Sequence, residues 1–198
     1  MQESYTIPRG VQTNVSRQRI VAKVVLCGGW QVGKTELRRR YMGETFIQDH
    51  LSTLGADYSV KKVKLDEDTI IELQIWDLAS QPGFESLRQR FFKGTSAAIM
   101  VFDLERPETF KEFDSWFEQL WRGMQEKAMP IAIIGNKSHL NNDQITEEEV
   151  MKYIEKLKTD NDIHDANIFY IKTNEKTGEN INHCLHNLAT SLFELLKD

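Results

Sequence analysis

The chain has 198 residues, of which 40% are hydrophobic and 28% charged, so it is long enough for one globular domain with a sizeable core. Its formal net charge of −5 and the lack of a basic stretch interspersed with aromatic residues exclude a general nucleic-acid binder. There is no bilayer-length apolar run and no signal peptide, which predicts a cytoplasmic protein. The two cysteines, Cys27 and Cys184, are expected to be core residues rather than disulfide or metal ligands.

The first 18 residues are polar and contain the breakers Pro8 and Gly10. We expect residues 1–18 to form a flexible tail and residues 19–198 to form the domain. Neither end carries a lipidation motif, so we expect no direct lipid anchor, and any recruitment to a membrane would depend on a partner protein.

A complete G-x-x-x-x-G-K-[ST] motif follows the first apolar run, Ile20–Cys27, and precedes Glu36–Tyr41, a stretch without a helix breaker. A strand that leads through a glycine-rich turn into a helix points several backbone N–H groups at one place, where a phosphate can bind. In this motif Lys34 reaches the outer phosphates and the Thr35 hydroxyl ligates Mg²⁺. We therefore predict a site for a nucleoside triphosphate, formed by Gly28, Gly29, Trp30, Gln31, Val32, Gly33, Lys34, Thr35 and Glu36. The adjoining basic cluster Arg38–Arg40 is expected to be a solvated helix face.

Strand and helix signals alternate along the rest of the chain. Two alternating segments joined by Asp66-Glu67-Asp68 predict a hairpin of two antiparallel strands. Short apolar runs are typical of buried parallel strands, and longer segments with helix-start signals lie between them. The predicted strands are 20–27, 58–65, 70–76, 97–102, 131–134 and 168–171, and the later helices are 107–126, 146–158 and 178–196. This order predicts a three-layer α/β domain, with a six-stranded, mostly parallel sheet and helices on both faces.

In such a sheet the ligand lies at the carboxyl ends of the strands. Asp77 follows the hairpin and can hold Mg²⁺ beside Thr35. Gln81 can orient a water molecule towards a γ-phosphate. The two later strands are followed by Gly135–His139 and Lys172–Gly178.

With these motifs in this order, residues 20–196 resemble a small GTPase of the Ras superfamily, and the Rab branch is the nearest match. The resemblance implies that the chain binds GTP, GDP and Mg²⁺ and hydrolyses GTP. It implies that Lys34 and Gln81 are catalytic and that Thr35, Thr53 and Asp77 are Mg²⁺ ligands, with Thr53 in switch I.

The resemblance also assigns the base pocket and a surface for partners. Phe46 is expected to pack against the guanine, and Asn136 and Lys137 to recognise it. The supporting loop contains Asn174, Glu175 and Lys176. The effector or regulator surface is expected at Tyr58, Trp76, Phe91 and Phe84, and the protein is expected to be a monomer.

Two departures from the family concern hydrolysis. Trp30 stands where the family has a very small residue, and an indole there crowds the γ-phosphate unless it turns out to solvent. Ser80 replaces the switch II glycine, and its side chain restricts the backbone next to that phosphate. Together they predict slow hydrolysis.

Two further departures concern the base. His139 replaces the aspartate that accepts two hydrogen bonds from guanine, whereas a neutral imidazole accepts at most one. The loss is expected to cost about 2–4 kcal/mol. Glu175 replaces a small residue and either returns a carboxylate to the pocket or points to solvent; Asp143 is another candidate acceptor. Relaxed base selectivity is the remaining alternative.

We favour a nucleotide-dependent switch, because Lys34, Thr35, Thr53, Asp77 and Gln81 occur together. A non-catalytic pseudo-GTPase that acts as a scaffold is the alternative, and the residues that favour it are Trp30, Ser80 and His139. A kinase or an ATPase built on the same phosphate loop is a weaker reading, because no basic lid-like segment is evident.

Overall fold

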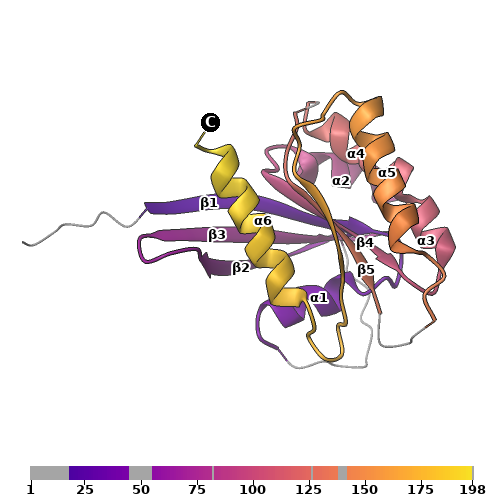
Figure 1. Cartoon of the computed structure of the whole chain (residues 1–198), viewed down its shortest axis with the longest axis horizontal. Helices are drawn as coiled ribbons and strands as arrows, with labels where there is room; N and C mark the ends of the chain where they lie inside the picture. Colours follow the sequence, from indigo (N-terminus) through magenta and orange to yellow (C-terminus); the bar gives the residue numbers. More distant parts are fainter. Residues whose placement is uncertain (1–17, 45–54, 82, 126, 138–141, 198) are drawn as a thin grey trace, which may run out of the picture.

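The computed structural model describes residues 18–44, 55–81, 83–125, 127–137 and 142–197. In these ranges six strands form one sheet in the order β2-β3-β1-β4-β5-β6, with helices on both faces (Figure 1). The strands are β1 (Gln18–Gly28), β2 (Ala56–Lys64), β3 (Thr69–Leu78), β4 (Ala97–Asp103), β5 (Ile131–Asn136) and β6 (Ile168–Lys172). The helices are α1 (Lys34–Tyr41), α2 (Glu85–Phe92), α3 (Pro107–Lys111), α4 (Phe113–Gly123), α5 (Glu147–Asp160) and α6 (Ile181–Leu195).

The sheet is parallel except for β2, which runs antiparallel to β3. The hairpin between them turns on Asp66, whose Oδ1 accepts hydrogen bonds from the backbone N–H groups of Asp68 at 2.9 Å and Thr69 at 2.7 Å. The predicted fold class is confirmed, including the single antiparallel strand.

The predicted helices 146–158 and 178–196 correspond to α5 and α6. The Thr146 side chain accepts a hydrogen bond from the Glu149 backbone N–H at the start of α5, and the Glu149 carboxylate accepts one from the Thr146 backbone N–H at 2.8 Å. This reciprocal pair satisfies two backbone donors that a helix start leaves open. Helix α6 begins three residues later than the predicted Gly178, after Asn180 in the left-handed conformation.

The segment 107–126, predicted as one helix, is divided at Glu112 into α3 and α4. Glu112 keeps helical dihedral angles, φ −72° and ψ −10°, so the division is a local change in hydrogen bonding rather than a change of direction. Helix α4 ends at Gly123, and Gln125 has a positive φ of 60° that a continuing helix cannot accommodate. Helix α2 was not predicted, because its eight residues give only a short apolar pattern.

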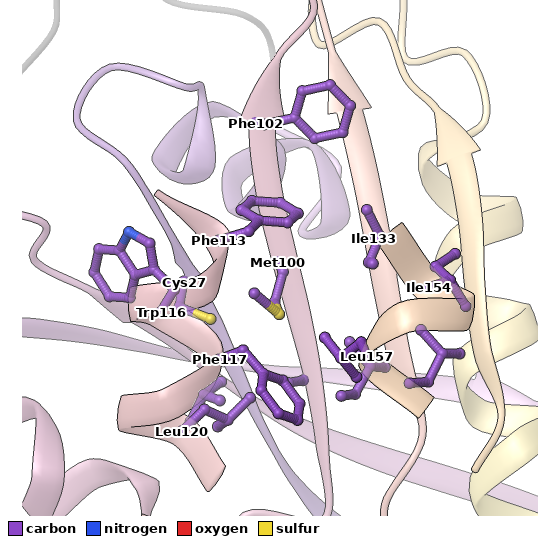
Figure 2. Close-up of a cluster of buried hydrophobic side chains, with 14 of the residues drawn as sticks. Cys27, Met100, Phe102, Phe113, Trp116, Phe117, Leu120, Ile133, Ile154 and Leu157 are labelled. Carbon is purple, nitrogen blue, oxygen red and sulfur yellow. The ribbon is translucent and has the colours of Figure 1, made fainter. Parts of the chain in front are cut away.

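The core is divided into two clusters by the sheet, because successive strand residues point to opposite faces. On one face Met100 packs with α4 and α5 residues, including Phe113 and Ile154, as Figure 2 shows. On the other face Ile99 belongs to the cluster formed with α1 and α6. Helices thus cover both faces, and the strand ends are left to carry the polar residues.

Both cysteines are fully buried and free, as predicted for core residues. Cys27 lies inside the first cluster (Figure 2), and burial raises the pKa of its thiol to about 12. Neither thiol is therefore suited to nucleophilic or metal chemistry. In the part of the chain that the structure describes, no helix is long and apolar enough to cross a membrane.

Candidate functional site

The glycine-rich loop after β1 is held close to two other strands. Gly28 has a φ of 139°, and a β-carbon there would stand 2.1 Å from the Val101 carbonyl oxygen of β4. Gly33 has a φ of 93°, and its β-carbon would stand 2.2 Å from the Asn136 amide nitrogen. A side chain at either position would need a backbone conformation that only glycine adopts readily, and it would collide with the neighbouring strand. The two glycines therefore fix a narrow backbone cradle at the carboxyl edge of the sheet.

Lys34 begins α1 and folds back over this cradle. Its ammonium group donates hydrogen bonds to the carbonyl oxygens of Gly28 at 2.8 Å and Gly29 at 2.7 Å. The residue is only 7% exposed, and burial lowers the pKa of Lys34 to about 8 although the nearby Asp77 raises it. A buried cation whose hydrogen bonds among the described residues go to neutral carbonyl oxygens is suited to receive an anion.

Thr35 and Asp77 meet beside the cradle. The Thr35 hydroxyl donates a hydrogen bond of 2.7 Å to Oδ2 of Asp77, and Asp77 is fully buried as the penultimate residue of β3. Hard oxygen ligands of this kind suit Mg²⁺, which keeps several waters and phosphate oxygens rather than an all-protein cage. The residues present thus fit a magnesium ion bound together with phosphate.

Asn136 links this end of the site to the predicted base end. It is the last residue of β5 and is fully buried. Its Nδ2 donates to the Val32 carbonyl of the phosphate loop at 2.9 Å. Its Oδ1 accepts from the Thr173 hydroxyl, after β6, at 2.9 Å. One amide therefore ties together the loops that follow β1, β5 and β6.

Lys137 follows in the left-handed conformation, with a φ of 68°. Its ammonium group lies 2.6 Å from Oδ2 of Asp103, which also accepts from Arg106 at 2.8 Å. Burial alone would raise the pKa of Asp103, but these hydrogen bonds lower it overall. Arg106 also donates to the Trp30 carbonyl at 2.9 Å. Asp103 and Arg106, which the sequence analysis did not single out, thus connect the base motif to the phosphate loop.

The Trp30 side chain is not packed into the site. The residue is 53% exposed, which corresponds to the alternative in which the indole turns out to solvent. Its neighbour Gln31 has a positive φ of 56°. Behind the loop, a β-carbon on Gly29 would stand 2.7 Å from a carboxylate oxygen of Glu112. The phosphate loop therefore packs closely against Glu112 on one side, and the Trp30 side chain lies on its solvent-exposed side.

The segment after β3 is held by an arginine that the sequence analysis missed. Arg88 is 3% exposed, and its Nη1 donates to the carbonyl oxygens of Ala79 at 3.1 Å and Gln81 at 3.3 Å. Its other edge donates to the Gln119 amide oxygen at 3.1 Å, and its guanidinium lies 4.6 Å from the centre of the Trp116 ring. A sequence signal exists, because Arg88 occupies the same helix face as the buried Phe92 four residues later.

The predicted catalytic residue itself, Gln81, is half-buried, as is Ser80 before it. The Gln81 amide oxygen Oε1 is buried and has no hydrogen-bond partner among the described residues. Such an atom is unfavourable in a resting structure and is commonly satisfied by a water or a ligand. Gln81 thus holds a buried acceptor that the described residues do not satisfy.

The loop after β6 contains Asn174, Glu175 and Lys176. Asn174 and Glu175 are buried, 5% and 4% exposed, so Glu175 does not point to solvent. Asp143, considered above as an alternative acceptor, instead forms an ion pair of 2.7 Å with Lys172. The loop also receives hydrogen bonds from Arg40 of α1, so the expectation of a wholly solvated basic cluster in α1 was wrong.

Three of the four aromatic residues predicted to meet partners form a continuous row. The ring centres of Tyr58 and Trp76 are 4.8 Å apart, and those of Trp76 and Phe91 are 5.3 Å apart. Tyr58 is 44% exposed, whereas Trp76 and Phe91 pack against the first core cluster. Phe84 precedes α2 and is half-buried. Glu36 is buried in α1.

Three predicted site residues, Phe46, Thr53 and His139, lie outside the described residues. The others, apart from the partner aromatics, gather at the carboxyl ends of β1, β3, β5 and β6. This edge can hold a phosphate chain at Lys34 and a planar ligand towards Asn136 and Lys137.

Comparison with known proteins agrees with this arrangement. A model of the Ras family matches residues 23–194. Ras-related protein Rab7 of Drosophila melanogaster is 30% identical over 182 residues, which cover 90% of this chain and 84% of that protein. Ras-related protein Rab-7a of Paramecium octaurelia is 31% identical over 186 residues, with 92% and 86% covered. Ras-related protein Rab-7b of Mus musculus is 35% identical over 136 residues, 68% of each chain. The chain therefore belongs to the Ras family, within the Rab branch of small GTPases, which are nucleotide-binding switches.

Proposed function

We propose that this protein is a guanine-nucleotide-dependent switch that binds GTP and GDP with Mg²⁺ and hydrolyses GTP slowly to GDP and phosphate. The observation that carries the proposal is the position of Asn136, which joins the phosphate loop at Val32 to the loop after β6 at Thr173. A ligand that spans a phosphate site and a base site needs these loops in one fixed arrangement. Membership of the Ras family supports the same assignment.

Lys34 is proposed to bind the outer phosphates. Its hydrogen bonds to Gly28 and Gly29 would be exchanged for phosphate oxygens, which bind an ammonium group more strongly than neutral carbonyls do. Its pKa of about 8 leaves most of the side chain charged at neutral pH. Because the site is buried, this charge acts in a medium that screens it little.

Thr35 and Asp77 are proposed to hold Mg²⁺, together with Thr53, which lies outside the described residues. The ion, when bound, neutralises charge on the phosphate oxygens. The protein's own contribution is to fix two oxygen atoms, one of Asp77 at the end of β3 and one of Thr35 at the start of α1. Release of the γ-phosphate would then free Thr53 and the segment at Ser80 and Gln81, which is the switching event.

Gln81 is proposed to orient the attacking water. Its amide oxygen, buried and without a hydrogen-bond partner, can accept a hydrogen bond from that water and direct its lone pair at the γ-phosphorus. The water oxygen forms the new bond to phosphorus, the bond to the β-phosphate oxygen breaks, and the water protons leave with the phosphate product and solvent. Lys34 stabilises the charge that develops on the phosphate oxygens.

Trp30 and Ser80 are proposed to make this step slow. The exposed indole of Trp30 stands at the open side of the phosphate loop, where it hinders an arginine supplied by an activating partner. Ser80 limits the backbone freedom of the residue next to Gln81. We expect Ser80→Gly to raise the intrinsic single-turnover hydrolysis rate by about tenfold, and Trp30→Gly to raise the rate by about tenfold when an activating partner supplies an arginine. Unchanged rates in both variants would remove the explanation.

The first experiment is to purify the full chain, denature it and identify the nucleotide that is released. The stripped protein is then titrated with GTP, GDP, ATP and XTP in the presence and absence of Mg²⁺. Retained guanine nucleotide, and tighter binding of GTP than of ATP, is the expected result. Absence of selective binding would instead support the non-catalytic scaffold, and a strong preference for ATP would support an ATPase.

The row formed by Tyr58, Trp76 and Phe91, with Phe84 nearby, is proposed as the surface for effector or regulator proteins. Because these residues flank the proposed switch segments, a partner there can distinguish the two nucleotide states. Such a partner is also the proposed route of any membrane recruitment of the monomer. Tyr58→Ala should weaken partner binding without changing the affinity for GDP.

A further inference from the structure

The three consecutive arginines of α1 have three different environments. Arg38 forms an ion pair of 2.7 Å with Asp57 of β2 and donates to the Ser59 hydroxyl at 2.6 Å. Arg40 donates through Nε to the carbonyl oxygen of Glu175 at 2.8 Å and through Nη2 to the carbonyl oxygen of Lys176. For Arg39, between them, the structure gives no side-chain hydrogen bond or ion pair within the described ranges.

The loop that Arg40 contacts is also shaped from within. Oδ1 of Asn174 accepts from the backbone N–H groups of Lys176 at 3.0 Å and Thr177 at 3.1 Å. The Asn174 carbonyl accepts from Gly178 at 2.8 Å. Asn174 thus forms the turn itself, whereas the carbonyl groups of Glu175 and Lys176 accept hydrogen bonds from Arg40, which is 135 and 136 positions away in sequence.

A guanidinium group suits this task because its planar fork can donate to two acceptors at once. The carbonyl groups of consecutive loop residues are otherwise available to water, and a loop held only by its own turn can open locally. Helix α1 is a firm support, because Tyr41 and Leu37 on its inner face are fully buried against the cluster shared with α6. In Figure 1, α1 lies beneath the first turn of α6, next to this loop.

We propose that Arg40 is a positioning residue for base binding: it couples the helix that begins with Lys34 to the loop that forms one wall of the base pocket. Lys34 and Arg40 are six residues apart, which is about 9 Å along a helix. The same rigid element therefore places the phosphate-binding ammonium group and the carbonyl groups of Glu175 and Lys176. The part of this inference that concerns nucleotide binding rests on the proposed guanine-nucleotide site.

The coupling matters in this chain because the base motif carries His139 in place of a carboxylate. With fewer hydrogen bonds to the base, affinity depends more on a wall that is already in place before the nucleotide arrives. Glu175, whose side chain is buried, has its backbone fixed by Arg40. Loss of Arg40 would therefore disturb the base end and leave the phosphate end intact.

The test compares Arg40→Ala with Arg39→Ala, a matched control on the same helix, and Arg40→Lys. Fluorescent GDP reports base and phosphate binding together, and competition by tripolyphosphate reports phosphate binding alone. We expect Arg40→Ala to bind GDP about tenfold more weakly, because two charge-assisted hydrogen bonds are lost, and tripolyphosphate unchanged. Arg39→Ala should match the wild type. Arg40→Lys should recover part of the loss, because an ammonium group can reach one of the two carbonyls.

Equal GDP affinity in Arg40→Ala and the wild type would overturn the proposal, as would an equal loss of GDP and tripolyphosphate affinity. If the wild type itself binds no guanine nucleotide, the proposed function fails and the coupling is tested separately by hydrogen exchange of residues 173–178 without nucleotide. Faster exchange there in Arg40→Ala than in Arg39→Ala supports the coupling. Identical exchange in the two variants refutes it.

Discussion

The phosphate end and the base end of the site differ in how far they keep the residues of the Ras family. At the proposed phosphate end Lys34, Thr35 and Asp77 match, and the Thr35 and Asp77 side chains meet through a hydrogen bond, whereas Trp30 and Ser80 beside them do not match. At the base end Asn136 and Lys137 match, whereas His139 and Glu175 do not. The phosphate end is one continuous loop whose carbonyl groups hold Lys34, and Asn136 ties this loop to the sheet at Val32. The base end depends on loops that are held by distant residues.

The two ends recognise their ligand by different kinds of contact. Phosphate binding needs backbone donors and one cation, and few other residues can supply them. Base recognition combines several weaker contacts, so a lost carboxylate can be offset by better positioning of the remaining wall. The two ends should therefore respond differently to substitution.

The largest effect is expected at the phosphate end. Lys34→Met should weaken GDP binding by at least about a hundredfold, because it removes a buried charge-assisted contact to phosphate. The same variant should not lower the unfolding temperature of the nucleotide-free protein, because it removes a buried cation bound only by carbonyl groups. Titration with fluorescent GDP and thermal unfolding measure the two quantities. Binding within tenfold of the wild type would contradict the role of Lys34.

The base end is tested by restoring the carboxylate that His139 replaces. His139→Asp should raise GDP affinity by about thirtyfold and increase the preference for GTP over XTP, because aspartate accepts two hydrogen bonds from guanine. Glu175→Gln is the companion variant. If His139→Asp gains little while Glu175→Gln loses affinity, Glu175 already supplies the acceptor and the two ends differ less than we propose.

A smaller effect is expected from the loss of Arg88, which supports the segment at Gln81. Arg88→Met should lower the single-turnover hydrolysis rate by about tenfold, because the carbonyl groups of Ala79 and Gln81 lose their common donor. GTP affinity should change less than the rate, since the hydrogen bonds of Arg88 among the described residues go to Ala79, Gln81 and Gln119 rather than to the phosphate loop. Arg90→Met, an exposed position on the same helix, is the control. Equal rates in the two variants would show that Arg88 has only a structural role.

The smallest expected effect is a pH dependence confined to the phosphate end. Lys34 has a pKa of about 8, lowered by burial, so it is mostly charged below pH 8 and loses its proton above it. Bound phosphate favours the charged form, so affinity for tripolyphosphate should fall by about fourfold between pH 7 and pH 8.5 beyond any change caused by the ligand. Lys34→Arg, which stays charged, supplies that reference. A parallel pH profile in the wild type and Lys34→Arg would mean that Lys34 does not titrate in this range.

Much of the fold was predictable because its signals are local. The alternation of apolar runs and helix starts gives the order of elements, and the hairpin at Asp66 gives the one antiparallel strand. The phosphate loop was predictable for the same reason, since Gly28 to Thr35 is one continuous segment. Helix α2 was missed because eight residues carry too little periodicity to distinguish a helix from a loop.

Tertiary structure alone decided how the site is held together. The contacts that matter most here join residues far apart in sequence: Asn136 to Val32 across 104 positions, Arg40 to Glu175 across 135, and Arg106 to Trp30 across 76. The sequence by itself determined which residues carry the chemistry, because a motif needs a particular residue type at a particular spacing. Which arginine supports a loop depends on the packing of distant elements: Arg38, Arg39 and Arg40 are consecutive, and only the fold decides what lies beside each of them.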